Sequence, residues 1–110
     1  MAFETPSLII NDAVITASGT SPVFNAYDVK TLDLEVVASA VSGTSPSLTI
    51  TAQWSLDGVN FGGNVAVGSA ITTPITRVVG LTVEGPYFQL LYTVSGTTPS
   101  FTISAMVYEY

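Results

Sequence analysis

The chain of 110 residues contains no cysteine and no histidine. Without cysteine there are no disulfides, thiolate metal sites or cysteine nucleophiles. Without histidine the commonest general base and metal ligand is missing, and a Ser-His-Asp triad cannot be built. We therefore expect no enzymatic activity, no cofactor and no metal, and a stability that comes from packing and strand pairing.

Charge is scarce, and most of it is negative. The chain has 2 Lys and Arg against 8 Asp and Glu, a formal net charge of −6, and charged residues make up 9% of it, whereas soluble domains typically carry about a quarter. Because binding to nucleic acid depends on clusters of Lys and Arg, we expect no nucleic-acid partner. A surface of Thr, Ser, Gly, Asn and Gln suits a subunit that packs against neighbours. It is equally consistent with an acidic domain that merely stays soluble.

Long hydrophobic runs are also missing. Hydrophobic residues make up 47% of the chain, but every apolar stretch is interrupted before the roughly 18 to 20 residues that a membrane span requires. The N-terminus has no basic region followed by an apolar stretch, so we expect no secretion signal, no membrane partner and synthesis in a cytoplasm. The length fits one domain. We expect an N-terminal arm over residues 1–6 and a folded domain over residues 7–110.

Apolar and polar residues alternate with a period of two over much of the chain. Residues 32–40 and 48–56 alternate on either side of a Ser-Gly-Thr-Ser-Pro segment, which predicts a β-hairpin over residues 31–61. A second long hairpin is expected to pair residues 87–94 with residues 100–110. With the shorter β-rich segments and no helical period, the sequence predicts an all-β fold. We expect a single antiparallel β-sandwich of seven to eight strands, jelly-roll or Ig-like.

The pattern Ser-Gly-Thr-[Ser/Thr]-Pro occurs at residues 18–22, 42–46 and 95–99. Glycine supplies positive φ, and proline pushes the residue before it into an extended conformation, so we interpret all three copies as turns. Asn11 and Asp12 interrupt the first β-rich segment and suit a turn or a bulge.

Few residues are candidates for chemistry. Asp33 and Glu35 share one strand face, as a glycosidase carboxylate pair would, but two acids on an exposed sheet face are far more often simply solvated. Asp57 and Asn60 lie in a Gly-rich segment that lacks the acid-rich ligand set of a calcium loop, so we predict a turn there. Trp54 is interpreted as a core residue.

Aromatic residues and the N-terminal arm are the candidates for binding a partner. Exposed aromatic rings can stack on sugars or complete a subunit contact, and the arm can reach a neighbour or remain a frayed terminus. The candidate partner-contact residues are Phe3, Pro6, Phe61, Tyr87, Tyr108 and Tyr110.

Residues 42–50 and 53–61, together with residues 27–34 and 92–102, resemble small structural proteins of tailed bacteriophages. The likeness covers most of the chain from residue 18 onward. A Gln-Trp-Ser-x-Asp-Gly pattern, as at residues 53–58, also occurs in tail and carbohydrate-binding modules.

The resemblance implies a virion structural protein without catalytic activity, a capsid decoration (cement) protein. Such a protein would sit on the capsid exterior after synthesis in the host cytoplasm, form a homotrimer, and bridge neighbouring copies of the major capsid protein. The matching positions are turns and strands, so the resemblance assigns no functional residue. The alternative is a tail- or fibre-associated carbohydrate-binding β-sandwich module that uses Phe61 or Tyr87.

Overall fold

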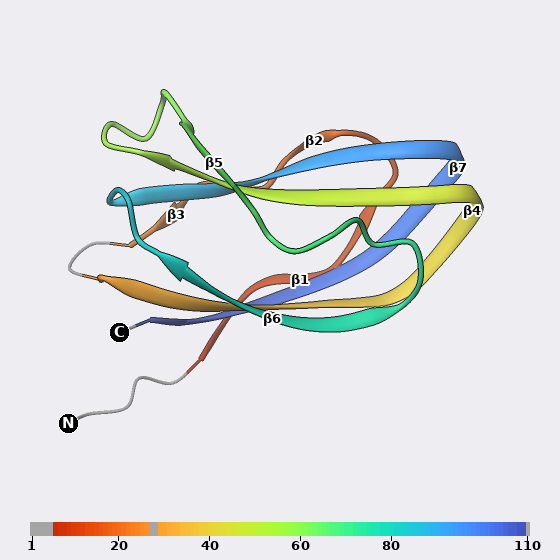
Figure 1. The fold of residues 1–110 in the computed structure, drawn as a ribbon, viewed down its shortest axis with the longest axis horizontal. Helices are drawn as coiled ribbons and strands as arrows, with labels where there is room; N and C mark the ends of the chain where they lie inside the picture. The colour runs from red at the N-terminus through yellow and green to blue at the C-terminus, as the bar shows by residue number, and fades with distance from the viewer. Residues whose placement is uncertain (1–5, 27–28, 110) are drawn as a thin grey trace.

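The computed structural model describes residues 6–26 and 29–109, and these residues form β-strands and no helix. All strand pairs are antiparallel, which confirms the predicted all-β fold. The strands are β1 (Ser7–Ile15), β2 (Gly19–Thr20), β3 (Phe24–Asn25), β4 (Thr31–Ser55), β5 (Gly62–Ala66), β6 (Ile75–Thr82) and β7 (Tyr87–Glu109), as drawn in Figure 1.

Strands β4 and β7 are long, and they pair with each other along nearly their whole length. Leu32 lies opposite Glu109 at one end of the pair, and Ser55 lies opposite Tyr87 at the other. The two predicted hairpins are therefore wrong, because the residues before and after each turn pattern pair with the other long strand. The turn pattern does mark a change of direction, but the chain bends out of the plane of the sheet and does not reverse within it.

The bend folds the β4–β7 ribbon into two facing layers (Figure 1). In the first layer the order is β1, the second half of β7, the first half of β4, and β6. In the second layer the order is β2 with β3, the first half of β7, the second half of β4, and β5. Since β4 and β7 run through both layers, one continuous network of strand pairs makes the sandwich.

The pairing identifies the topology as a jelly roll. Cutting β4 and β7 at their bends and counting β2 with β3 gives eight segments in chain order. The first pairs with the eighth, the second with the seventh, the third with the sixth, and the fourth with the fifth, as in one long hairpin. The β4–β7 pairing rolls that hairpin up. Of the two expected topologies, the structure has the jelly roll.

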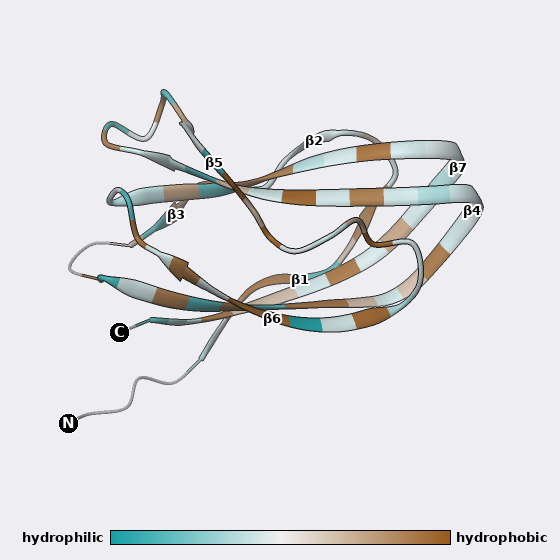
Figure 2. Ribbon diagram, in the orientation of Figure 1, coloured by the Kyte–Doolittle hydropathy of each residue, from teal (hydrophilic) through white to brown (hydrophobic). Residues whose placement is uncertain are grey.

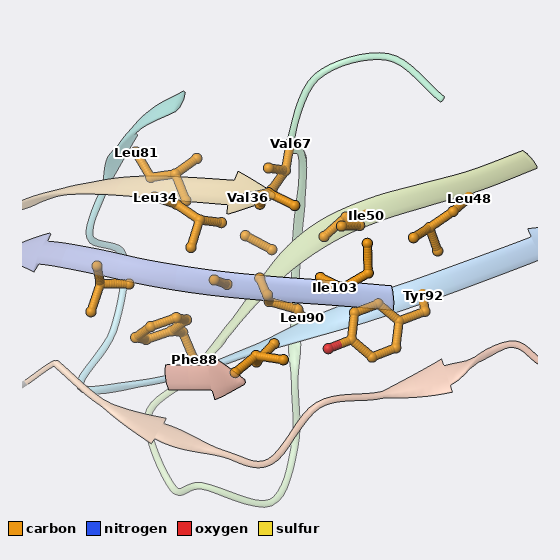
Figure 3. Close-up of a cluster of buried hydrophobic side chains, with 14 of the residues drawn as sticks. Leu34, Val36, Leu48, Ile50, Val67, Leu81, Phe88, Leu90, Tyr92 and Ile103 are labelled. Atoms are coloured by element: carbon orange, nitrogen blue, oxygen red, sulfur yellow. The ribbon is translucent and has the colours of Figure 1, made fainter. Parts of the chain in front are cut away.

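Alternate residues of the two long strands point between the layers and form the core. Figure 2 shows the apolar–polar alternation along β4 and β7, and Figure 3 shows the buried side chains meeting from both layers. Burying each large apolar side chain stabilises the fold by roughly 1.5–3 kcal/mol. The largest core side chains that are less than 2% exposed are Phe88, Phe101, Leu32, Leu34, Leu48, Ile50, Ile71, Leu90 and Ile103.

Trp54 belongs to this core, as predicted. Its side chain is 5% exposed, and its ring centroid lies 5.3 Å from that of Phe88 at an interplanar angle of 40°. Phe24 packs on Phe88 from β3 at the same distance. These three rings close the core at the end of the sandwich opposite the bend.

Several register shifts interrupt the strand pairing, and two of them correspond to features of the sequence discussed above. Between the pairs Ile10–Ala105 and Ala13–Ile103, β1 has one residue more than β7. Asp12 has a φ of 47° there; its N–H donates to Ser104 Oγ at 3.0 Å, and that hydroxyl donates to Asp12 Oδ1 at 3.1 Å. The expected irregularity at Asn11 and Asp12 is thus a bulge.

Another bulge, at Ser39, lies in β4 between the pairs Ala38–Ile103 and Ala40–Thr102. It exposes Ala40, which the sequence pattern placed in the core, and turns Val41 toward the core in its place. Leu56 was also expected on the core face, but β4 ends at Ser55 and Leu56 is 80% exposed.

The bend is formed by two copies of the turn pattern that lie against each other. Gly43 and Gly96 have φ values of 109° and 114°. A Cβ on Gly43 would lie 2.7 Å from the carbonyl oxygen of Thr98, and a Cβ on Gly96 would lie 2.7 Å from the carbonyl oxygen of Ser45. Each glycine therefore packs against the backbone of the other copy.

Replacing either bend glycine with alanine should destabilise the protein. Gly43→Ala and Gly96→Ala each push a methyl group into backbone atoms at a positive φ, so we expect each to lower the free energy of unfolding by about 2–4 kcal/mol. The control is Gly19→Ala, because a Cβ at Gly19 meets no atom within 4 Å. Urea denaturation measures all three, and equal stabilities would contradict the packing described for the bend.

The first copy of the turn pattern, at residues 18–22, is not a turn of this kind. Gly19 and Thr20 form β2 and pair with Tyr92 and Leu91. Ser21 is buried; its N–H donates to the Leu90 carbonyl at 2.8 Å, and its Oγ accepts from the Leu90 N–H at 2.8 Å. This copy therefore continues the edge of the second layer.

Tyr92 is a core residue whose ionisation is coupled to folding. Burial raises the pKa of Tyr92 to about 12 from 10.0, and a hydrogen bond with the Ser21 side chain opposes part of that rise. The unfolded chain therefore releases this proton at a lower pH than the folded chain does. The resulting contribution to stability is present in full below about pH 10 and is lost as the pH rises through about 12.

We predict that Tyr92→Phe will flatten the alkaline stability profile. Without an ionisable group at this position, the decline in melting temperature between about pH 10 and pH 12 should be smaller than in the unmodified protein. Circular dichroism melts across that range make the measurement. Parallel profiles for the two proteins would show that Tyr92 is not the group responsible.

Arg77 closes the sandwich edge between β5 and β6. Its Nη1 donates to the carbonyl oxygens of Val67 at 3.1 Å and Ser69 at 2.7 Å, on the segment that crosses from one layer to the other. Gly68 between them has a φ of 74°, and a Cβ there would lie 2.6 Å from Arg77 Nη1. One of the two basic residues of the chain is thus committed to holding this crossover.

Candidate functional site

Two hollows on the surface are large enough for a small ligand or a partner side chain. The Trp54 hollow, of about 430 Å³, is lined by Trp54, Ser55, Leu56, Asp57, Asn60, Gly62, Gly63 and Glu84. The outer-face hollow, of about 310 Å³, is lined by Pro6, Asp33, Glu35, Val78, Met106, Val107 and Tyr108.

The rim of the Trp54 hollow is a loop fixed by Asp57. Asp57 Oδ1 accepts hydrogen bonds from the Ser55 hydroxyl at 2.7 Å and from the N–H groups of Val59 and Asn60 at 2.9 and 2.8 Å. Asp57 Oδ2 accepts from Asn60 Nδ2 at 2.8 Å. These donors, the backbone N–H groups first, hold the pKa of Asp57 well below its usual value. The segment is the predicted turn, stabilised from within.

The inner wall of the same hollow is the indole of Trp54. Its Nε1–H is buried and has no hydrogen-bond partner in the part of the chain that the structure describes. Gly63 lies beside it, because a Cβ on Gly63 would be 3.7 Å from Trp54 Cδ1 and 3.0 Å from Glu84 Oε2. The indole edge and the Glu84 carboxylate therefore border the same space.

The outer-face hollow lies on the solvent side of the first layer. Leu8 lies opposite Met106, Met106 opposite Glu35, and Glu35 opposite Val78, so these side chains form a row across all four strands of the layer. Leu8 is 52% and Val78 65% exposed. Asp33 lines the hollow as well, so the two acids do share an exposed face, as the sequence predicted.

The structure brings some of the predicted contact residues together and separates others. Pro6 and Tyr108 both line the outer-face hollow. Tyr87 begins β7, and a Cβ on Gly58 would lie 3.6 Å from its ring, which places this tyrosine under the Asp57 loop. Phe61, which follows that loop, is half-buried. The remaining two candidates, Phe3 and Tyr110, lie outside the described residues, and the contact roles of all six stay predictions.

The sequence did not predict the apolar residues that line the outer-face hollow, and it did not predict that the buried Nε1–H of Trp54 has no partner among the described residues. Met106 sits between the core residues Ala105 and Val107 in a period-two strand, so the alternation itself could have placed it outside. The unpaired Trp54 Nε1–H has no signal in the sequence, because it depends on which groups the fold brings near it.

No helix among residues 6–26 and 29–109 has the length and apolar character needed to cross a membrane.

Comparison with known proteins gives matches only at the level of structure. No family model matches the sequence, and no curated protein matches it. Solved structures of infectious bursal disease virus do match the fold. The VP2 subviral particle aligns over 96% of this chain and 31% of its own, with 15% identity and a TM-score of 0.60.

Two further structures of the same virus agree. The Gx strain structure covers 98% of this chain and 33% of its own, at 12% identity and a TM-score of 0.58. The T13 viral particle covers 96% of this chain and 30% of its own, at 12% identity and a TM-score of 0.56. The chain therefore spans about a third of the length of the viral capsid chains that it resembles, and it shares their fold.

Proposed function

We propose that this chain is a non-enzymatic structural protein of a virion, of the capsid decoration type, that stabilises a shell by bridging major capsid subunits. The observation that carries the proposal is the match of 96% of the chain to a viral capsid fold at a TM-score of 0.60. A fold hosts many functions, so the surface of the molecule must supply the rest of the argument.

The outer-face hollow supplies the contact surface in this proposal. It combines exposed apolar side chains, which gain free energy when they leave water, with Pro6 and Tyr108, two of the predicted contact residues. The surrounding sheet is rigid, because its four segments are paired on both sides except at the edges. A rigid sheet loses little conformational entropy when it binds, which favours a static bridge.

The proposal is tested on particles of the virus that encodes the chain. Particles stripped of the protein should rupture at a lower temperature than complete particles, and adding back the purified protein should restore the rupture temperature, because each bridge adds buried interface. Light scattering after heating reports rupture. Stripped and complete particles that rupture at the same temperature would contradict the bridging role.

A surface variant tests the assigned face. Val78→Asp places a charge in the outer-face hollow without disturbing the core, and it should abolish rebinding to stripped particles because burying an unpaired carboxylate is costly. Val59→Asp is the matched control, since Val59 is 77% exposed and lies outside this hollow. Cosedimentation with particles makes the measurement, and equal binding of both variants would assign the contact to another face.

The trimeric state belongs to the same proposal. Light scattering coupled to size exclusion should give about three times 11.4 kDa if the trimer assembles before it reaches the shell. The alternative prediction of a carbohydrate-binding tail or fibre module through Phe61 or Tyr87 stays a prediction, and glycan arrays with Phe61→Ala and Tyr87→Ala test it.

A further inference from the structure

Strand β6 forms one edge of the first layer, and it is the longest sheet edge without a register shift. Its residues pair with β4 continuously, from the pair Thr31–Thr82 to the pair Ala38–Ile75. The other edge strands are less regular, because β1 contains register shifts, β2 and β3 have 2 residues each, and β5 has 5. Within residues 6–26 and 29–109, β6 makes no other backbone pairing.

The hydrogen bond just beyond β6 shows which of its backbone groups point to the free side. The Val83 N–H donates to the Lys30 carbonyl at 3.0 Å. Because bonded and non-bonded pairs alternate along an antiparallel ladder, the odd-numbered residues of β6 bond to β4, and the even-numbered residues point their N–H and C=O groups away from it. The residues with outward-pointing groups are Thr76, Val78, Gly80 and Thr82. Their donors and acceptors form a row that matches a further strand.

This edge lacks the features that usually prevent strand addition. Folded proteins protect their sheet edges with proline, bulges or charged side chains. Strand β6 contains no proline, and its one charged side chain, Arg77, is committed to the carbonyl oxygens of Val67 and Ser69. On its solvent face Val78 is 65% exposed. The edge therefore suits β-strand addition, in which main-chain hydrogen bonds supply affinity and side chains supply specificity.

Glu35 selects the chemistry of the added strand. It lies opposite Val78 and forms no hydrogen bond or ion pair with the residues that the structure describes. The residue of an added antiparallel strand opposite Val78 would lie about 10 Å from Glu35 between Cα atoms, since the two successive pairs span about 4.5 and about 5.5 Å. A lysine or arginine side chain there can lay its stem on Val78 and pair its charge with the carboxylate.

A second copy of this chain has no such side chain in reach. Its basic residues are Lys30 and Arg77, and Arg77 is already bonded. Lys30 lies beside Val83, which at roughly 3.4 Å per residue is about 17 Å along the ladder from Val78. Two copies paired through β6 would therefore leave both Glu35 carboxylates without a counter-charge. The edge fits an extended basic segment of a different protein.

We propose that an extended segment of the shell partner adds to β6 as a fifth, antiparallel strand of the first layer, with a lysine or arginine side chain paired to Glu35. This inference rests on the proposed bridging function and deepens it. It assigns the backbone edge and the charge through which the partner is held.

Proline on the free edge tests the backbone pairing. Thr76→Pro combined with Gly80→Pro removes two outward N–H donors and leaves the bonds to β4, because edge strands accept proline where the N–H faces solvent. Thr76→Ala combined with Gly80→Ala is the matched control, which keeps both N–H groups. In cosedimentation the proline pair should bind stripped particles at least about tenfold more weakly than the alanine pair. Circular dichroism melts establish that both variants fold.

Two further measurements do not depend on how well the proline pair folds. Hydrogen exchange of the unmodified protein should show slower exchange of the outward β6 amides on stripped particles than in the free protein. Glu35→Gln should weaken rebinding by about tenfold at low salt and by less at high salt, as expected for one charge-assisted bond. Its control is Asp12→Asn, on the opposite edge strand β1, which should leave rebinding unchanged.

The outcomes separate this inference from the bridging function. Equal binding of the proline and alanine pairs, or unchanged exchange of β6 on particles, would overturn strand addition even where the unmodified protein restores the rupture temperature. Equal effects of Glu35→Gln and Asp12→Asn would overturn the charge pairing. A free protein of about twice 11.4 kDa that the proline pair converts to a monomer would assign the edge to a second copy instead. Failure of the unmodified protein to restore the rupture temperature would overturn the bridging function, and this inference with it.

Discussion

The fold depends on the contact between two glycines and two stretches of backbone at the bend. Gly43 lies against the carbonyl oxygens of Thr97 and Thr98, and Gly96 lies against those of Thr44 and Ser45. A side chain at either glycine would hold the two strands apart where the ribbon turns from one layer to the other. The contact is reciprocal, so neither strand can bend in this way unless the other does. This reciprocal contact explains why the pattern Ser-Gly-Thr-[Ser/Thr]-Pro occurs in both β4 and β7, at positions that lie opposite each other in the strand pair.

Because the ribbon is bent, its two inner faces meet and form the core. The remaining strands then extend the two layers at their edges. The short strands and β1 pair with the free edges of β4 and β7, while the crossover after β5 is tied down by Arg77. At the opposite end of the sandwich, Trp54 and Phe88 close the core, and the Asp57 loop forms the rim of the hollow beside Trp54. Both hollows follow from this arrangement. One forms where the loop leaves the core, and the other where a row of side chains crosses the four strands of the first layer on its outer face.

The sequence was informative wherever a property is local. The period of two identified the core faces of β4 and β7 and placed Asp33 and Glu35 together on the outside, and the turn chemistry located both bends. Strand partners are not local, and a Gly-Pro turn signal cannot distinguish a reversal from an out-of-plane bend, so both hairpins were predicted wrongly. The bulge at Ser39 has no clear signature either, which is why Ala40 and not Val41 was placed in the core. For the same reason, the sequence named Pro6 and Tyr108 without showing that they line one hollow.

Charge decides which kind of partner suits the outer face. A partner that covers the hollow must compensate Glu35, because a buried carboxylate without a counter-charge or hydrogen-bond donors is costly. A second copy of this chain is poorly equipped to do so. It carries 2 basic residues, and the guanidinium of one of them, Arg77, is already bonded to the carbonyl oxygens of Val67 and Ser69. The outer face therefore fits a different protein with basic and apolar side chains better than it fits itself, and a trimer of this chain would have to form through another surface.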